Sequence, residues 1–232
     1  MAPSSTTVTA FVRKLATTDL AFAPKPTAAI LPILTAASLG HRQSWLRPSI
    51  EEALRDLPPK PPRIPPQPRN PLDDAVSYPR RLALGQLKEA FVKAAIMIGV
   101  PRSIRLLVEM QEFLDADDLG QPFVRQALEA PGCTVSDLGE NGLAGLRTMY
   151  EYNLGDIFSN LDNTGLEDLR FVSQYVTYGV ALTPCAASPH ASSTDPFDAD
   201  PRLLSVVTLS TLLPQRTERE ILWHLRAALR RG

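Results

Sequence analysis

Apolar residues recur at helical spacing along most of this chain of 232 residues. In Leu84–Val100 they fall at positions 87, 91, 94, 95 and 98, which places them on one face of an α-helix. The stretches 101–116 and Gly165–Leu182 follow the same period. Pro201–Leu213 is nearly all apolar, and its Asp-Pro entry and leucine content favour a buried helix over a buried strand. Since no alternating segments are separated by hairpin turns, the sequence predicts an all-α fold with little or no sheet.

Three of the predicted helices have an apolar side that we expect to be covered in the folded protein. In 101–116 this side consists of Ile104, Leu107, Val108 and Leu114. In Gly165–Leu182 it consists of Leu169, Val172, Val176 and Gly179. In the last helix, which opens at Glu218, the main apolar stripe is Ile221, Leu222, Leu225, Ala228 and Leu229.

Two segments of low order interrupt the helical pattern. Leu57–Pro71 contains eight prolines in fifteen residues, so it can be neither a helix nor a central strand. We interpret it as an inserted polyproline II linker, with a ligand for an SH3-like groove as the alternative. Thr183–Pro201 is rich in Ser, Pro, Ala and Asp and is expected to be a long loop. Residues 1–20 are interpreted as a tail that weakly resembles a transit peptide.

Residues 22–54 align without gaps on residues 197–229 at a shift of 175 positions. The aligned pairs include Phe22 with Phe197, Pro26 with Pro201, Leu34 with Leu209 and Thr35 with Ser210. Both segments run from a proline start through a helix of small residues and a polar break to an amphipathic helix. This shared order predicts an internal duplication.

The duplication divides the chain into a first helical repeat at 21–125, which carries the insert 57–71, and a second at 126–232. In the first repeat the pair of helices at 84–114 follows the amphipathic helix, but the second repeat has no closing helices. We expect the 84–114 hairpin or another subunit to cover the second repeat, unless the chain is shortened relative to its relatives. An uncovered apolar face normally marks an interface.

Composition excludes several classes of function. The chain has 24 Lys and Arg against 25 Asp and Glu, so it lacks the excess of basic charge that a nucleic-acid binder needs. No apolar run approaches the roughly 18 residues of a membrane span. Cys133 and Cys185 are the only cysteines and form no Cys-x-x-Cys pair, so no metal site is predicted and both are expected to be reduced. We expect a cytoplasmic protein, with the mitochondrion as the weaker alternative.

Several motifs follow one another in a recognisable order. Tyr178 and Gly179 end one predicted helix, and Asp200-Pro-Arg202 opens the next after a loop. The closing helix then reads Glu-x-x-x-His-Leu-Arg-x-Ala-Leu-x-x-Gly from Glu220 to Gly232. Together with a Gly-x-Pro break in the first repeat, this order resembles the carboxymuconolactone decarboxylase-like family. That superfamily also holds the alkylhydroperoxidase D type proteins.

The resemblance implies an all-α fold of helical hairpins, assembled as homotrimers or higher rings with active sites near subunit contacts. In this family the decarboxylase branch removes CO2 from a lactone acid without a cofactor. The peroxidase branch uses a Cys-x-x-Cys pair together with a Glu and a His. Here the residues before His224 are EREILW, so the thiolate nucleophile of a peroxidase is missing. We therefore expect a small-molecule substrate, no cofactor and a homo-oligomer.

Glu220 and His224 are four residues apart and share one side of their helix. A carboxylate one turn from a histidine suits general acid or base catalysis, so we predict these two as catalytic residues. Tyr175 or Tyr178 is predicted to donate to an oxyanion, and Arg202 to hold the substrate carboxylate. Trp223 is a further candidate for substrate contact, although a core or interface position is favoured for it. The alternative for Glu220 and His224 is a solvated pair without a catalytic role.

These residues predict a cofactor-independent enzyme that decarboxylates a small organic acid or lactone, or performs related acid–base chemistry on it. The alternatives are an alkylhydroperoxidase-like antioxidant protein and a non-catalytic helical oligomerisation module.

Overall fold

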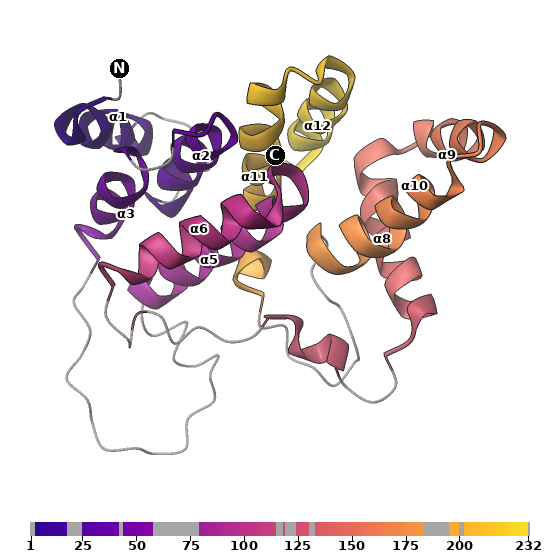
Figure 1. Cartoon of the computed structure of the whole chain (residues 1–232), viewed down its shortest axis with the longest axis horizontal. Helices are drawn as coiled ribbons and strands as arrows, with labels where there is room; N and C mark the ends of the chain where they lie inside the picture. Colours follow the sequence, from indigo (N-terminus) through magenta and orange to yellow (C-terminus); the bar gives the residue numbers. More distant parts are fainter. Residues whose placement is uncertain are drawn as a thin grey trace. The chain divides into compact units, whose positions relative to one another are not determined.

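The computed structural model describes residues 3–17, 25–41, 44–57, 79–114, 118, 124–129, 133–182, 195–199 and 202–231. These residues form helices and turns and contain no β-strand, which confirms the predicted all-α fold (Figure 1). The chain divides into two compact units, each of which is discontinuous in sequence. The first combines residues 1–122 with 202–217, and the second combines 123–201 with 218–232. Among the described residues, no helix is both long enough and apolar enough to cross a membrane.

The first unit is a bundle centred on α2 and α5. Its helices are α1 (Ser5–Thr17), α2 (Lys25–Ser38), α3 (Leu46–Leu54), α5 (Pro79–Ile98), α6 (Val100–Gln111) and α11 (Arg202–Leu212), which continues into the short turn η5 (Leu213–Gln215). Helices α5 and α6 form a hairpin, visible as the magenta pair in Figure 1. Gly99 separates them with a φ of +88°, a value that glycine adopts without strain, and Pro101 lies in the first turn of α6.

Helices α2 and α11 pack against each other although about 175 positions of sequence separate them. Both helices carry small residues that are fully buried, such as Ala29 of α2 and Thr208 of α11. The Thr35 hydroxyl donates to the backbone carbonyl of Ser210 at 3.3 Å. The repeat alignment pairs these same two positions, and contact between equivalent residues is what a local two-fold arrangement gives. The duplication itself stays a prediction.

The segment that we expected to be an N-terminal tail instead forms α1 over Ser5–Thr17. Val8 and Val12 lie one turn apart and are fully buried, so this short helix has an apolar side to dock. Its outer side is held by an ion pair between Arg13 and Glu52 of α3, with Nε and Oε1 3.0 Å apart. The two buried valines thus outweigh the Ser/Thr-rich composition that had suggested a tail.

The core of the first unit contains an ion pair that the helical pattern did not reveal. Lys93 and Glu89 lie one turn apart on α5, and their side chains are 1% and 4% exposed. The Lys93 Nζ is 3.1 Å from Oε1 of Glu89. Charged residues this deeply buried are rare unless they are paired. The flanking residues Ala90 and Ala94 are fully buried, so the pair lies on the packed side of the helix.

The second unit is built around α8 and the helix η3. Its elements are η2 (Val124–Glu129), α8 (Val135–Tyr150), α9 (Asn153–Asn163), α10 (Glu167–Phe171), η3 (Val172–Leu182), η4 (Pro196–Ala199) and α12 (Glu218–Arg231). Thr134 and Asp137 form a capping box that starts α8. Helix η3 is a π-helix, a rare form that is often found at functional sites.

Glycines permit the contact between α8 and η3. A Cβ atom on Gly142 would lie 1.8 Å from the backbone oxygen of Gln174, and one on Gly179 would lie 2.5 Å from the backbone oxygen of Leu138. The Gln174 side chain crosses the same contact and donates from Nε2 to the carbonyl of Gly139 at 3.0 Å. The two backbones therefore approach more closely than any larger residue would allow.

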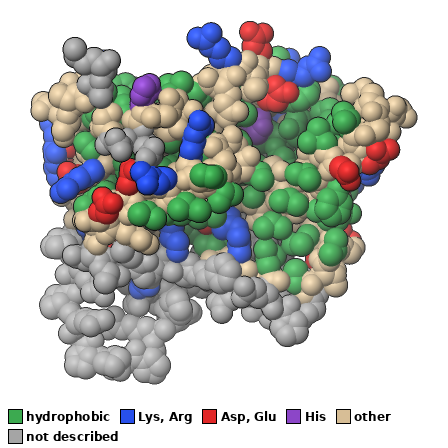
Figure 2. All heavy atoms as spheres, viewed as in Figure 1, with side chains coloured by type: hydrophobic (Ala, Val, Ile, Leu, Met, Phe, Trp, Pro, Cys, Tyr) green, Lys and Arg blue, Asp and Glu red, His purple; other side chains and the backbone are tan. Residues whose placement is uncertain are grey.

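Most residues of the three predicted apolar faces are not buried, although Gly179 of η3 is. Helix α6 buries Ser103, Leu106 and Met110, whereas Ile104 and Val108 are about half exposed. The largely exposed apolar residues of the second unit include Leu169, Val172, Val176, Leu222, Leu225 and Leu229. Figure 2 shows many apolar side chains, in green, at the surface of the face in view. In each of these helices the buried side therefore differs from the side with the largest number of apolar residues.

Candidate functional site

Helix α12 buries a polar side that contains the predicted histidine. His224 is 5% exposed and Ala227 is 1% exposed, while Glu220 and Trp223 are partly buried. The four residues recur at helical spacing and share one side of the helix. His224 is therefore not a solvated surface histidine, which was the alternative to a catalytic role.

Arg230 ties the end of α12 to the end of α8. Its Nη2 donates to the carbonyl of Met149 at 2.9 Å, and its Nε lies 2.9 Å from Oε1 of Glu151. Carbonyl groups in the last turn of a helix have no partner within the helix, so this arginine satisfies a group that would otherwise need water. The contact fixes α12 along α8 and brings Trp223 beside Tyr150.

Tyr150 is the centre of an aromatic cluster. Its ring meets Trp223 of α12 edge to face at 5.2 Å between centroids, and meets Tyr178 of η3 at 6.4 Å. Burial raises the pKa of the Tyr150 hydroxyl above its ordinary value; the hydrogen bond with Tyr178 opposes this shift and the nearby Glu220 carboxylate adds to it. Tyr150 therefore keeps its proton at neutral pH and is able to donate a hydrogen bond.

Tyr175 and Tyr178, one of which was predicted to donate to an oxyanion, have different surroundings. Tyr178 is 4% exposed and contacts Tyr150. Tyr175 instead stacks on Phe171, with ring centroids 4.5 Å apart and an angle of 17° between the planes. The wide turns of a π-helix change the spacing of side chains around its axis, so residues three apart do not share a face as they would in an α-helix. Of the two, only Tyr178 joins the cluster around Tyr150.

The structure does not assign Arg202 to this cluster. Arg202 begins α11, which belongs to the first unit, whereas Glu220, Trp223 and His224 belong to the second. Asp200, the other polar residue of that motif, lies outside the described residues, as does Cys185. Cys133 is described, is partly buried and is a free thiol.

Tyr150 was not among the residues that the sequence predicted for the site. It lies four residues after the buried Leu146 at the end of α8, so helical spacing alone places it on the inner side. That signal identifies a packed aromatic residue and not a functional one. Its place between Trp223 and Tyr178 depends on how three helices meet.

Tyr175 lines a separate pocket of about 600 Å3 in the second unit. The seven lining residues are Asp162, Glu167, Asp168, Arg170, Phe171, Gln174 and Tyr175. Three are carboxylates and one is an arginine, so the pocket is negatively charged. A pocket with this charge repels an organic acid. Its charge therefore does not suit the acidic substrate that the sequence predicted Tyr175 to bind.

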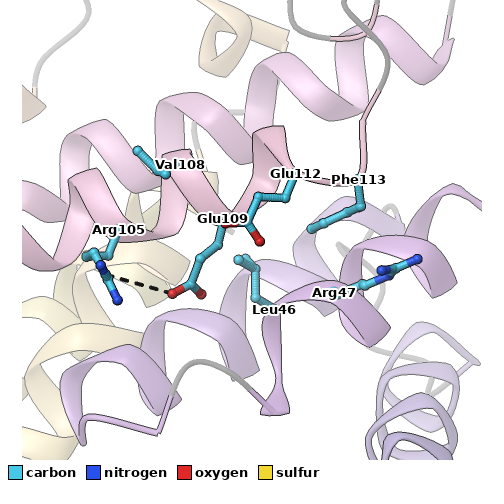
Figure 3. A pocket seen from close by; sticks show the side chains of 7 residues that line it. All are labelled: Leu46, Arg47, Arg105, Val108, Glu109, Glu112 and Phe113. Atoms are coloured by element: carbon cyan, nitrogen blue, oxygen red, sulfur yellow. Dashed lines mark ion pairs between the residues drawn. The ribbon is translucent and has the colours of Figure 1, made fainter.

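A groove of about 370 Å3 lies between α3 and α6 of the first unit. Figure 3 shows its lining: Leu46, Arg47, Arg105, Val108, Glu109, Glu112 and Phe113. Arg105 faces Glu109 at 4.0 Å, while Arg47 pairs with Glu51 at 2.7 Å and lies over the Phe113 ring. The arginines are thus engaged within the protein. The groove includes none of the residues that the sequence predicted for the active site.

Comparison with protein-family models, curated proteins and solved structures finds no match to this chain. The resemblance to the carboxymuconolactone decarboxylase-like family therefore rests on the sequence motifs alone. Within the described part of the chain, no group of three or more His, Cys, Asp and Glu residues is arranged to hold a metal ion.

Proposed function

We propose that this chain is a carboxymuconolactone decarboxylase-like enzyme that carries out cofactor-independent acid–base chemistry on a small organic acid or lactone. The observation that carries the proposal is the contact between the partly buried Tyr150 and the buried Tyr178, near Glu220 on the helix of His224. Two tyrosine hydroxyls and the Glu220 carboxylate thus lie near one another in a partly buried cluster, where electrostatic interactions are stronger than in water.

In the proposed reaction the bond between the substrate carboxylate and its neighbouring carbon breaks. CO2 leaves, and the electron pair stays on the substrate as an enolate. The Tyr150 or Tyr178 hydroxyl donates a hydrogen bond to the enolate oxygen, and the Glu220 carboxylate helps to keep the proton on Tyr150. His224 delivers the proton that the carbon takes up and regains one from solvent. Arg202 remains, on the resemblance alone, the proposed carboxylate-binding residue.

A second candidate function is a non-catalytic helical assembly module. The observation that favours it is the exposure of Leu222, Leu225 and Leu229 on α12, since exposed apolar surface often marks an interaction site. The family resemblance also implies a homo-oligomer, a trimer or a larger ring. A cytoplasmic location is a further part of the proposal. An alkylhydroperoxidase-like function is disfavoured because no cysteine precedes His224 within its helix.

A screen of small organic acids and lactones for CO2 release tests the enzyme against the module. The variants His224→Gln and Tyr178→Phe remove proton transfer and hydrogen bonding with little change in volume. We expect each to lower turnover by about a hundredfold or more, as is usual for loss of general acid–base catalysis. Tyr152→Phe is the matched control, because Tyr152 is 79% exposed.

The enzyme hypothesis fails if His224→Gln turns over as fast as the native chain does. Circular dichroism and thermal melting of each variant separate a loss of chemistry from a loss of folding. Absence of turnover with every acid and lactone in the screen leaves the assembly module as the better account.

A further inference from the structure

The acidic pocket in the second unit has a chemistry different from that of the tyrosine cluster. Its volume of about 600 Å3 falls in the usual range for small-molecule sites, which is about 300–1,000 Å3. Its wall combines carboxylates from α9 and α10 with aromatic rings from α10 and η3. None of the residues of the Tyr150 cluster lines it.

The only cation that lines the pocket is already engaged. Arg170 forms an ion pair with Asp162, and its guanidinium lies 4.8 Å from the centre of the Phe158 ring. Asp162 and Arg170 thus balance each other, which leaves the charges of Glu167 and Asp168. Among the described residues these two exposed carboxylates form no ion pair, so the pocket keeps a net negative charge.

Acidic residues in the first turn of a helix also stabilise its N-terminus, which accounts for Glu167 and Asp168 in part. Helix stabilisation does not account for the aromatic wall beside them. Phe171 is 50% exposed, yet its ring is held parallel to Tyr175 at 4.5 Å. An aromatic side chain that is partly open to solvent next to carboxylates is a recognised arrangement for binding organic cations.

The polar atoms of the pocket are mainly hydrogen-bond acceptors. Gln174 uses its Nε2 to donate to the Gly139 carbonyl, which leaves Oε1 as an acceptor. The Oδ1 atom of Asp162 is buried and accepts no hydrogen bond, so it is a further acceptor without a donor. A ligand that fits this wall carries several N–H donors and a positive charge.

We propose that this pocket binds an organic cation, namely a primary ammonium or guanidinium group attached to an apolar body. The charged group lies against Glu167 and Asp168, where it makes charge-assisted hydrogen bonds. The apolar body stacks on Phe171 and Tyr175. This assignment does not depend on the acid–base chemistry proposed above, since the ligand has the opposite charge and the two sites share no residue.

Calorimetric titration of the full chain with phenethylammonium chloride tests the proposal, and sodium 3-phenylpropionate is the matched probe. The two compounds share an apolar body and differ in the sign of their charge. We expect the ammonium to bind saturably, and more weakly as salt is added. The carboxylate is expected to bind at least about tenfold more weakly, because charge-assisted hydrogen bonds are replaced by repulsion.

Variants locate the site. The double variant Glu167→Gln with Asp168→Asn is expected to weaken ammonium binding about tenfold. Phe171→Leu keeps an apolar side chain but removes the ring, and is expected to weaken binding about two- to fivefold. Asp156→Asn is the matched control, because Asp156 is an exposed carboxylate on α9 that does not line the pocket.

Three results overturn the proposal. The first is equal affinity for the two probes, and the second is unchanged ammonium affinity in the double variant. The third is no saturable binding of phenethylammonium by the native chain. Because the two carboxylates are exposed, the double variant is expected to fold, and its circular dichroism spectrum checks this.

Discussion

At the scale of single residues, the pair Lys93 and Glu89 offers a direct test of the first unit's core. Lys93→Ala leaves the Glu89 carboxylate buried without its lysine, so we expect a loss of about 3–5 kcal/mol in the free energy of unfolding. The double variant Glu89→Leu with Lys93→Met removes both charges and is expected to regain most of that loss. Urea unfolding measures both.

Arg105→Ala is the control for this pair. Arg105 is 62% exposed and faces Glu109 at 4.0 Å, so its removal is expected to change the stability by less than about 1 kcal/mol. A double variant as unstable as Lys93→Ala would show that packing, and not the loss of the lysine partner of Glu89, lowers the stability.

Because the pKa of Tyr150 is raised in the folded protein, we expect the free energy of unfolding to fall at alkaline pH. Its folded-state pKa is raised, first by burial, so the folded chain holds this proton at a pH where the unfolded chain has released it. The stabilisation is complete below the unfolded pKa of about 10 and is lost as pH rises through the folded value. Tyrosinate absorbance is expected to show one group that titrates later than exposed tyrosines. Tyr150→Phe should abolish this late step, whereas Tyr152→Phe should leave it intact.

The sequence pointed to part of this candidate site, but not to Tyr150 at the centre of its aromatic cluster. The helical spacing of Glu220 and His224 was enough to place them on one side of α12, and His224 proves to be buried. Tyr150 was missed because its environment depends on the meeting of α8, η3 and α12. Local spacing predicts which side of a helix a residue occupies, but not which residues from distant segments lie opposite.

At the scale of helices, the contact between α8 and η3 depends on glycine. Gly142→Ala places a methyl group 1.8 Å from the backbone oxygen of Gln174, so one of the two helices must move. We expect a loss of about 1–3 kcal/mol in the free energy of unfolding, as for other overpacked sites. Thermal and urea unfolding measure the change.

Gly155→Ala is the matched control within the second unit. Gly155 lies in α9, and a Cβ there would meet no atom within 4 Å. Because alanine is the better helix former, this change is expected to stabilise the chain by about 0.5–1 kcal/mol. If both substitutions stabilise the protein, the close contact at Gly142 is contradicted.

Helical periodicity located the helices but not the sides that they bury. For α6 it selected Ile104 and Val108, whereas the structure buries Leu106 and Met110. In the second unit, contacts form where Gly142 or other small residues let two backbones approach. The pattern of apolar residues does not reveal such contacts, because a helix face made of glycine and alanine is only weakly hydrophobic.

At the scale of the whole molecule, α11 was the element hardest to assign. A division of the sequence near residue 125 places 202–217 in the second half, but these residues join the first unit. Their partner α2 is about 175 positions away, as the bond from Thr35 to Ser210 indicates. No local pattern predicts such a pairing. The alignment of residues 22–54 with 197–229 indicated that the two segments are similar, but it did not indicate that they pack together.

The exposed leucines of α12 allow a test of whether this helix forms part of an oligomer interface. Leu229 is 82% exposed and Leu225 is 42% exposed, so a charged side chain at either position should not disturb the fold of an isolated chain. If α12 contributes to the proposed homo-oligomer, the native chain sediments as a trimer or larger, and Leu225→Lys with Leu229→Lys sediments as a monomer. The reason is that burying two unpaired lysines in an interface is strongly unfavourable. Leu213→Lys, at a residue of the first unit that is 53% exposed, is the control. A native chain that sediments as a monomer contradicts the assembly, and an oligomer that survives both substitutions places its interface away from α12.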